Sequence, residues 1–477
     1  MSADVIVIGA GVNGLVAAHL LAKAGRSVVV VEQRASESRQ RDVGWVPLAV
    51  MADLGLQPSA IGLRVNDPWV VSALPDGSRL ELYADMDKSV EAIKRLSAKD
   101  AAKWPEFCAR LRRLGSVLEA LYVQPPPDVE TTDLREMLHL AMVGLKVRLL
   151  GRQTMIDLIR ILPMSAAELL DDWFESDALK GALGAAGVMH LHQGPRSGGT
   201  AFGLLHHHVG CAAGVFRPPT SELSAVLATM PGVELRRGAA VQAITVDGGR
   251  ATGVVLASGE GIAAETVVSS ADPRRTMFGL VATGWLEPEY VHAVQNIKCR
   301  GVAATLTLTL NKPADFRTLL VAPSLDYLER AYDDAKYGRV SKDPWLEARA
   351  DGNVVTVHAQ YAPYALRDGA WDDARKKAFG DAVVDRLTAA APPLKGAITA
   401  CEVVTPKDLE AQYGLTEGQA YHGELTLDQI LFMRPVAGWG RYHTPIAGLF
   451  LCGAGTHPGG AIAGASGRNA ARVILRS

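Results

Sequence analysis

The sequence lacks the features that mark several classes of protein. Its 49 Lys and Arg residues nearly balance 51 Asp and Glu, so no excess of positive charge favours a nucleic-acid partner. Its five cysteines include no Cys-x-x-Cys pair, which argues against a disulfide framework or a cysteine zinc site and suits a cytoplasmic location. No run reaches the roughly 18 apolar residues of a membrane span, so we expect at most peripheral membrane contact.

A βαβ unit is predicted at the start of the chain. Residues 4–8 (DVIVI) form a β-branched run, residues 15–24 have helical periodicity, and residues 27–31 form a second apolar run that ends on Glu32. Strands that are apolar on both faces are typical of a parallel sheet covered by helices. The turn between the first strand and the helix, Gly9-Ala10-Gly11-Val12-Asn13-Gly14, fits the pattern GxGxxG.

In this context the glycines predict a dinucleotide site. Gly9 permits the tight turn, Gly11 lets a pyrophosphate approach the backbone, and Gly14 lets the helix pack closely on the strand. The free N–H groups at the start of the helix attract phosphates. Glu32 is placed to accept hydrogen bonds from ribose hydroxyls and would repel a 2′-phosphate, which disfavours NADP. The alternative is a glycine turn that binds nothing.

A glycine-rich segment near the C-terminus favours FAD over NAD. A predicted strand at 448–452 leads into Gly453-Ala454-Gly455, and we expect residues 456–462 to open a helix. Small residues there would let a flat ring lie against the backbone, with the helix N-terminus stabilising negative charge on a reduced flavin. The alternative is a helix cap with only a packing role.

The order of the elements predicts an α/β protein with a discontinuous Rossmann-like FAD-binding domain, a mixed-sheet substrate domain and an inserted helical subdomain. Short strands are expected at 233–237, 241–246, 253–257, 302–310 and 354–361, and helices from 87 to about 190, interrupted at Pro125–Pro127. We assign 1–65, 215–290 and 440–477 to the FAD-binding domain, 66–86 and 291–439 to the substrate domain, and 87–214 to the helical insertion or lid.

With both ends in view, the sequence resembles the FAD-dependent phytoene desaturase superfamily, in particular its phytoene dehydrogenase-related, pyridine nucleotide-disulphide oxidoreductase domain-containing branch. The resemblance spans nearly the whole chain and includes LPDG at 74–77, the segment 232–259, VVSSADP at 267–273, the run 422–460 and GRNAA at 467–471. It implies FAD as cofactor. The cofactor-binding positions it implies are Gly9, Gly11, Gly14 and Glu32 at the ADP half, Val241 at the adenine, and Gly453, Gly460, Ala461 and Ile462 at the ribityl and ring end. We also expect Val12, Asn13, Gln33, Arg34 and Arg41 at the cofactor.

The sequence departs from the superfamily pattern in two places. The acidic residue is normally followed within about ten residues by a Gly-Gly doublet that contacts the diphosphate, but residues 33–45 contain only one glycine and three arginines, and the segment after them looks shortened. Arg39 or Arg41 could replace the doublet as a charge clamp, or the segment could be a solvated basic loop. A glycine pair near the middle of the chain is replaced by Arg217-Pro218-Pro219-Thr220.

The leading functional prediction is an FAD-dependent dehydrogenase, desaturase or oxidase. It would pass a hydride from a C–H bond of an apolar or amphipathic, isoprenoid-like substrate to flavin N5, with oxygen or quinone as final acceptor. The alternatives are a flavin amine oxidase, with which Trp439 and Tyr442 near the ring are compatible, and a non-redox scaffold that keeps the fold. Arg434, His443 and His457 are nearby polar groups, but no catalytic acid or base is assigned.

Three further patterns have a structural interpretation. His190, His192 and His206–His208 have no carboxylate at ligand spacing, so we predict no metal site and expect these histidines to support a cavity. Ser466 lacks the strand-to-helix elbow of a hydrolase and is expected to pack inside the last helix. Residues 138–163 are amphipathic, which indicates either a core-facing helix pair or a patch that admits a lipophilic substrate from a membrane. The oligomeric state is not predicted.

Overall fold

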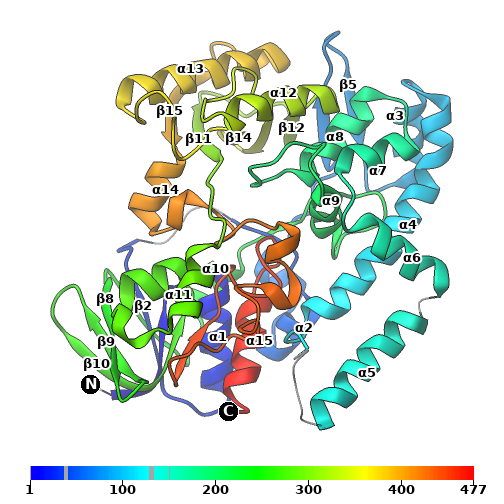
Figure 1. The fold of residues 1–477 in the computed structure, drawn as a ribbon. Helices are drawn as coiled ribbons and strands as arrows, with labels where there is room; N and C mark the ends of the chain where they lie inside the picture. Colours follow the sequence, from blue (N-terminus) through cyan, green and yellow to red (C-terminus); the bar gives the residue numbers. More distant parts are fainter. Residues whose placement is uncertain (1, 37–40, 128–133, 150) are drawn as a thin grey trace.

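The protein contains two large β-sheets and a group of helices packed beside them (Figure 1). The computed structural model describes residues 2–36, 41–127, 134–149 and 151–477. Within those residues, no helix is both long and apolar enough to span a bilayer.

The first sheet has the strand order β7-β2-β1-β10-β9-β8, with β16 paired to β10. Strands β7, β2, β1, β10 and β16 are parallel neighbours, whereas β9 runs antiparallel to both β10 and β8. The strands are β1 (Ser2–Ile8), β2 (Val28–Glu32), β7 (Glu234–Arg237), β8 (Val241–Asp247), β9 (Arg250–Leu256), β10 (Gly261–Ser269) and β16 (Leu449–Leu451). Gly248 and Gly249 form the β8–β9 turn with φ of 54° and 77°, the positive values that a tight hairpin turn requires.

Four helices cover one face of this sheet: α1 (Val12–Lys23), α2 (Leu48–Leu54), α10 (Leu223–Thr229) and α15 (Ala465–Ile474). The first and last of them lie side by side, α1 in blue and α15 in red, although they come from opposite ends of the chain (Figure 1). Strand residues alternate between this core and a second core on the other face, where α11 (Pro288–Gln295) packs.

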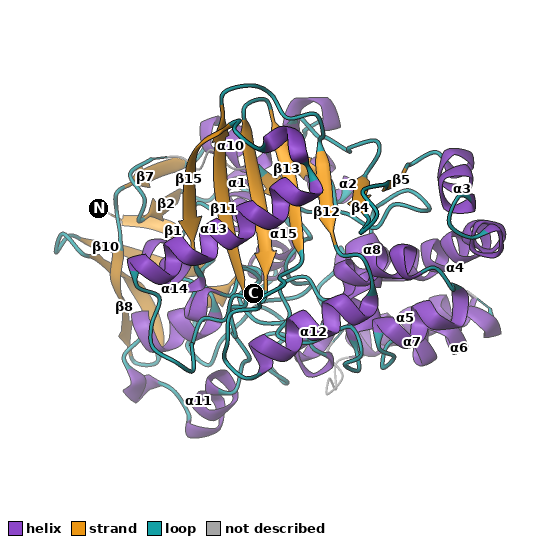
Figure 2. Ribbon diagram, turned by 90° about the horizontal axis from the view of Figure 1, so that it is seen from above, coloured by secondary structure: helices purple, strands orange, loops and turns teal. Residues whose placement is uncertain are grey.

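The second sheet is mixed, in the order β15-β11-β14-β13-β12-β4-β5, with only β12 and β4 parallel. Its strands are β4 (Val70–Ala73), β5 (Arg79–Leu82), β11 (Ala303–Leu310), β12 (Thr318–Val321), β13 (Leu346–Asp351), β14 (Val354–Gln360) and β15 (Ile398–Val404). Helix α13 (Asp373–Ala390) crosses one face of the sheet (Figure 2), where Phe379, Val383 and Leu387 join its core. Helices α12 (Leu325–Lys336) and α14 (Pro406–Tyr413) lie in the connections between strands.

The remaining helices lie beside the second sheet, and, among the described side chains, all of them except α5 contribute to one apolar core with the edge of that sheet. They are α3 (Met86–Lys94), α4 (Ala98–Tyr122), α5 (Leu134–Leu149), α6 (Arg152–Ile161), α7 (Ala166–Trp173), α8 (Asp177–Gly187) and α9 (Thr200–His208). Short helical turns occur at Pro58–Ile61, Arg275–Leu280, Thr283–Trp285, Pro392–Leu394, Thr416–Gly418, Leu427–Gln429 and Leu431–Met433. A two-residue ladder joins β3 (Asp42–Val43) to β6 (Thr220–Ser221).

The predicted fold class is confirmed: the chain combines a Rossmann-like parallel sheet with a mixed sheet and a helical part. One local prediction is wrong. The last helix begins at Ala465, not within 456–462, because that segment forms irregular turns in which Ala461 has a φ of 62°. The domain boundaries stay a prediction.

Candidate cofactor site

The glycine turn after β1 has the geometry that a dinucleotide requires. A Cβ on Gly9 would lie 2.4 Å from the Ser270 hydroxyl, and one on Gly14 would lie 2.2 Å from the Gly9 carbonyl oxygen, so both positions need glycine. Gly11 has no atom within 4 Å of its Cβ position and therefore leaves the backbone open to a phosphate. It is also the N-cap of α1, and among the described residues no side chain caps that end. Val12 and Asn13 follow it in the first turn, and the Oδ1 atom of Asn13 is buried without a described partner.

Glu32 lies at the end of β2 beside this turn. Its Oε2 accepts the Ala10 N–H at 2.8 Å, and its Oε1 accepts the Arg34 N–H at 2.9 Å and the Arg34 Nε–H at 3.2 Å. A carboxylate has lone pairs for about four bonds, so Glu32 keeps acceptor capacity for ribose hydroxyls. The Arg34 guanidinium also lies 5.3 Å from the centre of the Tyr413 ring.

A pocket of about 190 Å³ lies along the carboxyl ends of β1, β2 and β10. Its lining residues are Ile8, Gly9, Gly11, Val31, Glu32, Gln33, Arg34, Ala239, Val241, Ser270, Ala271, Asp272, Arg275, Leu280, Tyr413, Gly414, Leu415 and His422. Ligands of open α/β sheets bind outside the carboxyl ends of the strands, which matches this position. We call it the ADP pocket, because it brings together the residues expected at the ADP half.

Arg41 does not contact the ADP pocket as the proposed charge clamp on the diphosphate would require. The Arg41 guanidinium contacts Glu222 and the carbonyl of Gly62, and its Nε–H donates to Thr220 at 3.3 Å. Arg41 does not line the ADP pocket, and its donors stabilise the β3–β6 ladder instead. Arg39 lies outside the described residues.

The C-terminal glycine turn is covered by protein atoms. A Cβ on Gly460 would lie 2.1 Å from the Tyr421 ring, and a Cβ on Gly453 would lie 2.3 Å from the Ser270 carbonyl oxygen. The Trp45 N–H donates to the Ala461 carbonyl at 2.9 Å, and the Ala463 N–H donates to the Trp45 carbonyl at 2.8 Å. These two bonds flank Ile462, so the small residues expected to receive a flat ring contact the chain itself.

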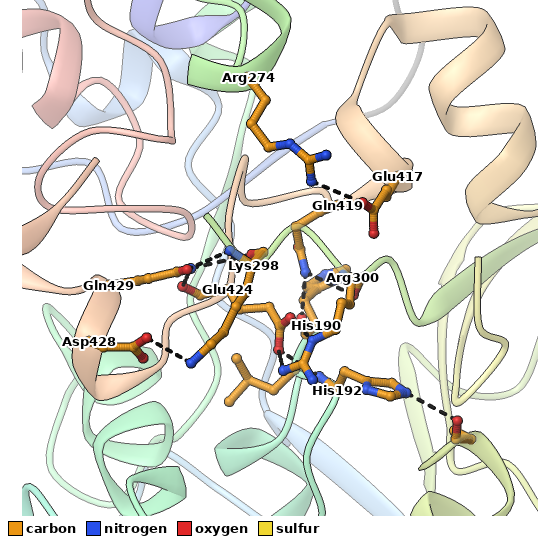
Figure 3. A network of polar contacts seen from close by, with 12 residues as sticks. His190, His192, Arg274, Lys298, Arg300, Glu417, Gln419, Glu424, Asp428 and Gln429 are labelled. Atoms are coloured by element: carbon orange, nitrogen blue, oxygen red, sulfur yellow. Dashed lines mark hydrogen bonds and ion pairs between the residues drawn. The ribbon is translucent and has the colours of Figure 1, made fainter. Parts of the chain in front are cut away.

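A polar network holds the segment that carries Tyr421 (Figure 3). Gln419 donates to the His190 carbonyl at 2.9 Å, and Glu424 forms a bidentate ion pair with Arg300 at 2.7 and 3.0 Å. Lys298 pairs with Asp428 at 2.7 Å, and Arg274 pairs with Glu417 at 2.9 Å. The network ties residues 417–429 to the loop before β11 and to the loop after α8.

Arg434 links residues 417–429 to the C-terminal glycine turn. Its buried guanidinium donates to the carbonyls of Tyr421, Gly423, Glu424, Gln429 and Ala454. Burial lowers the pKa of Arg434 to about 10, which leaves it charged at neutral pH. The residue is a structural cation here and not a free acid or base.

The buried histidines of α9 also support the turn. The His206 Nε2–H donates to the Gly460 carbonyl at 2.7 Å, so its Nδ1 accepts the Tyr122 hydroxyl at 2.8 Å. The His207 Nδ1–H donates to the Ala186 carbonyl, and its Nε2 accepts the Tyr421 hydroxyl at 3.0 Å. Burial lowers the pKa of His206 to about 3 and of His207 to about 4, so both are neutral. No group of three metal-ligating side chains occurs among the described residues.

The other sequence candidates have packing roles. Tyr442 is buried, and its hydroxyl donates to the His457 carbonyl at 2.8 Å, whereas Trp439 packs on Tyr290 with ring centres 5.3 Å apart. The two therefore do not form an aromatic cage. Arg217 is buried and pairs with Glu347 at 2.6 Å, which explains the departure at 217–220 as a link between the helical part and β13. Ser466 is fully buried inside α15, as predicted.

Comparison with known proteins identifies the kind of domain. Residues 4–188 match the model described as FAD dependent oxidoreductase. Residues 4–188 therefore contain a domain similar to that of the FAD-dependent oxidoreductases. FAD is accordingly its cofactor, and the ADP pocket fits the adenosine diphosphate half of FAD.

Relatives of this FAD-dependent oxidoreductase align over nearly its whole length. Pyridine nucleotide-disulfide oxidoreductase domain-containing protein 2 of Rattus norvegicus is 29% identical, covering 99% of this chain and 93% of that protein. Hydroxyneurosporene desaturase of Cereibacter sphaeroides is 27% identical, covering 99% and 97%. The first alignment spans 542 positions, more than the 477 residues of this chain, so the relative has segments that this chain lacks.

Solved structures confirm the fold at low identity. Putrescine oxidase bound to putrescine superposes with a TM-score of 0.56 at 14% identity, covering 100% of both chains. At that identity the likeness concerns the fold alone. The FAD-dependent oxidoreductase domain and the FAD cofactor that the resemblance implies are confirmed by the match at residues 4–188.

The fit of FAD to the structure differs between its two halves. The ADP half has open backbone at Gly11, a carboxylate at Glu32 and the orphaned Asn13 oxygen. At the ring half, the Tyr421 ring lies on Gly460, and the backbone of Trp45 is hydrogen-bonded to Ala461 and Ala463. Sequence reasoning missed Tyr421, although it directly precedes the matched run 422–460. It also missed His422, which lines the ADP pocket and whose Nδ1 is buried without a described partner.

Proposed function

We propose that this protein is an FAD-dependent dehydrogenase, desaturase or oxidase that removes a hydride from an apolar or amphipathic substrate. The observation that carries the proposal is the ADP pocket, with open backbone at Gly11 and a ribose acceptor at Glu32, in a chain with this domain. When bound, FAD supplies the hydride-accepting N5 of its ring. The protein's part is to hold the ADP end, orient the substrate C–H bond and exclude water.

An apolar substrate is supported by a cavity of about 380 Å³ beside Trp45, which we call the apolar cavity. Its lining is mostly apolar, with Val46, Met51 and Leu63, and includes the charged residues Arg112, Glu119 and Arg217. Its volume lies in the range of pockets for small organic ligands, about 300–1,000 Å³. The relative named hydroxyneurosporene desaturase supports the same class of substrate. We propose oxygen or a quinone as the final electron acceptor.

An exposed apolar face supports peripheral membrane contact as the source of such a substrate. Among the side chains that the structure describes, helices α5 and α6 expose large apolar ones: Met137, Leu138, Met142, Leu145, Leu149, Met155, Ile156 and Ile159. Arg148 and Arg152 are exposed on the same two helices, where they would meet anionic headgroups. Patches of this kind are rare on proteins that remain free in water.

Reconstitution with FAD tests the proposal. We expect purified protein to take up FAD and to lose flavin absorbance under anaerobic conditions when an apolar C–H substrate is added. A panel of amines beside isoprenoids separates an amine oxidase from a desaturase. Protein that stays colourless after incubation with FAD would contradict the redox assignment.

The covered ring end favours one second candidate, a non-redox scaffold that keeps the flavoprotein fold. The Gly11→Glu substitution distinguishes it, because a carboxylate at the open backbone repels the pyrophosphate. A cellular function that survives in this variant supports the scaffold, and one that is lost supports the FAD-dependent enzyme.

A further inference from the structure

We infer that this protein binds a carboxylic acid with an apolar chain, whose carboxylate is held at a cluster of arginines and whose chain lies in the apolar cavity. The inference rests on the proposed function and names the class of its substrate. The arginines line a small cavity of about 20 Å³. We call it the arginine pocket, after its lining residues Arg64, Arg217 and Arg349.

The arginine pocket and the apolar cavity are neighbours. Val65, Arg217 and Pro219 line both of them, so the two spaces meet at these side chains. A ligand with a charged head and an apolar chain is therefore able to occupy both at once. All four residues of the segment 217–220, where the sequence departs from the superfamily pattern, line the arginine pocket. The departure thus supplies one wall of this pocket.

Positive charge exceeds negative charge in the two linings. The charged residues there are four arginines and two glutamates, namely Arg64, Arg112, Arg217, Arg349, Glu119 and Glu347. Arg112 and Glu119 pair with each other at 2.5 Å, whereas Glu347 is shared by Arg217 and Arg349, each at 2.6 Å. Arg64 pairs at 3.4 Å with Asp351, which is mostly exposed and belongs to neither lining. Because arginine keeps its charge, the excess favours an anionic ligand.

Two buried donors in the lining of the arginine pocket have no acceptor among the described residues. The Arg217 side chain donates from Nε to Glu347 at 2.6 Å and from Nη1 to the Phe216 carbonyl at 3.1 Å, but its Nη2 has no described partner. The indole N–H of Trp69 also has none. Arg217 is 5% exposed and Trp69 is 1% exposed. A buried donor without an acceptor is destabilising, so both favour a ligand that brings acceptor oxygens.

The sizes of the two cavities favour a carboxylate head on an apolar chain. A volume of about 20 Å³ exceeds the roughly 10–15 Å³ that one water molecule requires, which suits a small flat head group better than a bulky one. The planar guanidinium also matches the two oxygens of a carboxylate. The apolar cavity, at about 380 Å³, holds the chain. Its lining residue Trp45 bonds Ala461 through the backbone, so the chain lies beside the segment expected at the flavin ring.

Titration calorimetry with decanoate at neutral pH tests the inference. Three comparison ligands are titrated in the same way, all below micellar concentrations. Decanol keeps the chain without the charge, acetate keeps the carboxylate without the chain, and decyltrimethylammonium reverses the charge. In the wild-type protein we expect decanoate to bind at least about tenfold more tightly than each of the three. Equal affinity for decanoate and decanol, or for decanoate and acetate, overturns the inference.

Substitutions of the two unpartnered donors locate the site. Arg217→Lys keeps the charge that pairs with Glu347 but lacks the guanidinium fork, and Trp69→Phe removes the indole N–H. We expect each variant to bind decanoate at least about fivefold more weakly, while decanol affinity changes less than about twofold. Trp104→Phe is the matched control, because Trp104 is also buried with an unpartnered N–H but lines neither cavity.

Arg64→Gln tests the same site if the buried variants do not fold. The ion pair between Arg64 and Asp351 is exposed, so its loss changes stability little. We expect decanoate affinity to fall at least about threefold in this variant. The control is Arg196→Gln, which breaks a similarly exposed pair with Asp326 and should leave decanoate affinity unchanged. Unchanged decanoate affinity in every folded variant of the arginine pocket overturns the inference.

Failure of the inference is distinguishable from failure of the proposed function. Protein that takes up FAD and oxidises an apolar substrate, but does not prefer decanoate over decanol, overturns the inference alone. Protein that binds decanoate as expected but takes up no FAD overturns the proposed function and leaves the carboxylate site supported.

Discussion

Alanine substitutions at Gly14 and Gly11 should change different properties, although the two residues belong to one turn: Gly14→Ala should lower stability, and Gly11→Ala should lower nucleotide affinity. A Cβ at Gly14 lies 2.2 Å from the Gly9 carbonyl oxygen, whereas ordinary contact begins near 3.4 Å, so α1 would have to move away from β1 by about 1.2 Å. Forcing one methyl group into packed surroundings costs about 1–3 kcal/mol. At about 2–4 °C per kcal/mol for a large domain, the ligand-free Gly14→Ala protein should melt roughly 2–12 °C lower.

Gly11→Ala should leave that stability nearly unchanged. Its φ of −69° suits any residue and its Cβ position is empty, so the loss should stay below about 1 kcal/mol, the scale of a helix N-cap. The added methyl group would instead stand where the pyrophosphate approaches, and nucleotide affinity should fall at least about tenfold.

Thermal melting of the ligand-free proteins and ADP titration of each variant check both effects. If Gly14→Ala melts like the wild type, or Gly11→Ala binds ADP as tightly as the wild type, the geometric assignment of these glycines is wrong.

Three further outcomes are expected. Burial alone would raise the pKa of Glu347, but the Arg217 and Arg349 guanidiniums outweigh it and hold this pKa well below its usual range; Glu347→Gln should therefore lower stability by about 3–5 kcal/mol. The control is Asp351→Asn, which removes the exposed ion pair between Asp351 and Arg64 and should cost at most about 1 kcal/mol. Equal melting temperatures for the two variants would refute the role of the buried pair. Burial lowers the pKa of several histidines to about 3 or 4, namely His206, His207, His208, His358 and His457. Below about pH 6.5 these histidines bind a proton in the unfolded chain but stay neutral in the folded chain. The free energy of unfolding should therefore fall by roughly 1.4 kcal/mol per histidine for each pH unit between about pH 6.5 and pH 4. Equal melting temperatures at pH 7.5 and pH 5 would contradict this. Co-sedimentation with anionic phosphatidylglycerol vesicles should be lost in a Leu145→Asp, Ile159→Asp double variant, whereas equal binding by the variant and the wild type would exclude the α5–α6 face.

Local patterns in the sequence were enough to predict the nucleotide-binding end. The β-branched runs at 4–8 and 27–31 and the three glycines between them act over about 30 residues, so their meaning does not depend on distant contacts. The hairpin at Gly248 and Gly249 was predictable for the same reason, because the positive φ it needs is a property of the turn itself.

The state of the ring end depended on contacts that no local pattern encodes. Trp45 meets residues 461–463, and Tyr421 and His206 meet Gly460, across separations of tens to hundreds of residues. The same small residues that admit a flat ring also admit the phenol ring of Tyr421, and only tertiary packing decides what lies there. The sequence by itself determined that a nucleotide half-site forms after the first strand. The tertiary structure decided what packs on the C-terminal glycine turn, because that depends on which side chains the fold brings there.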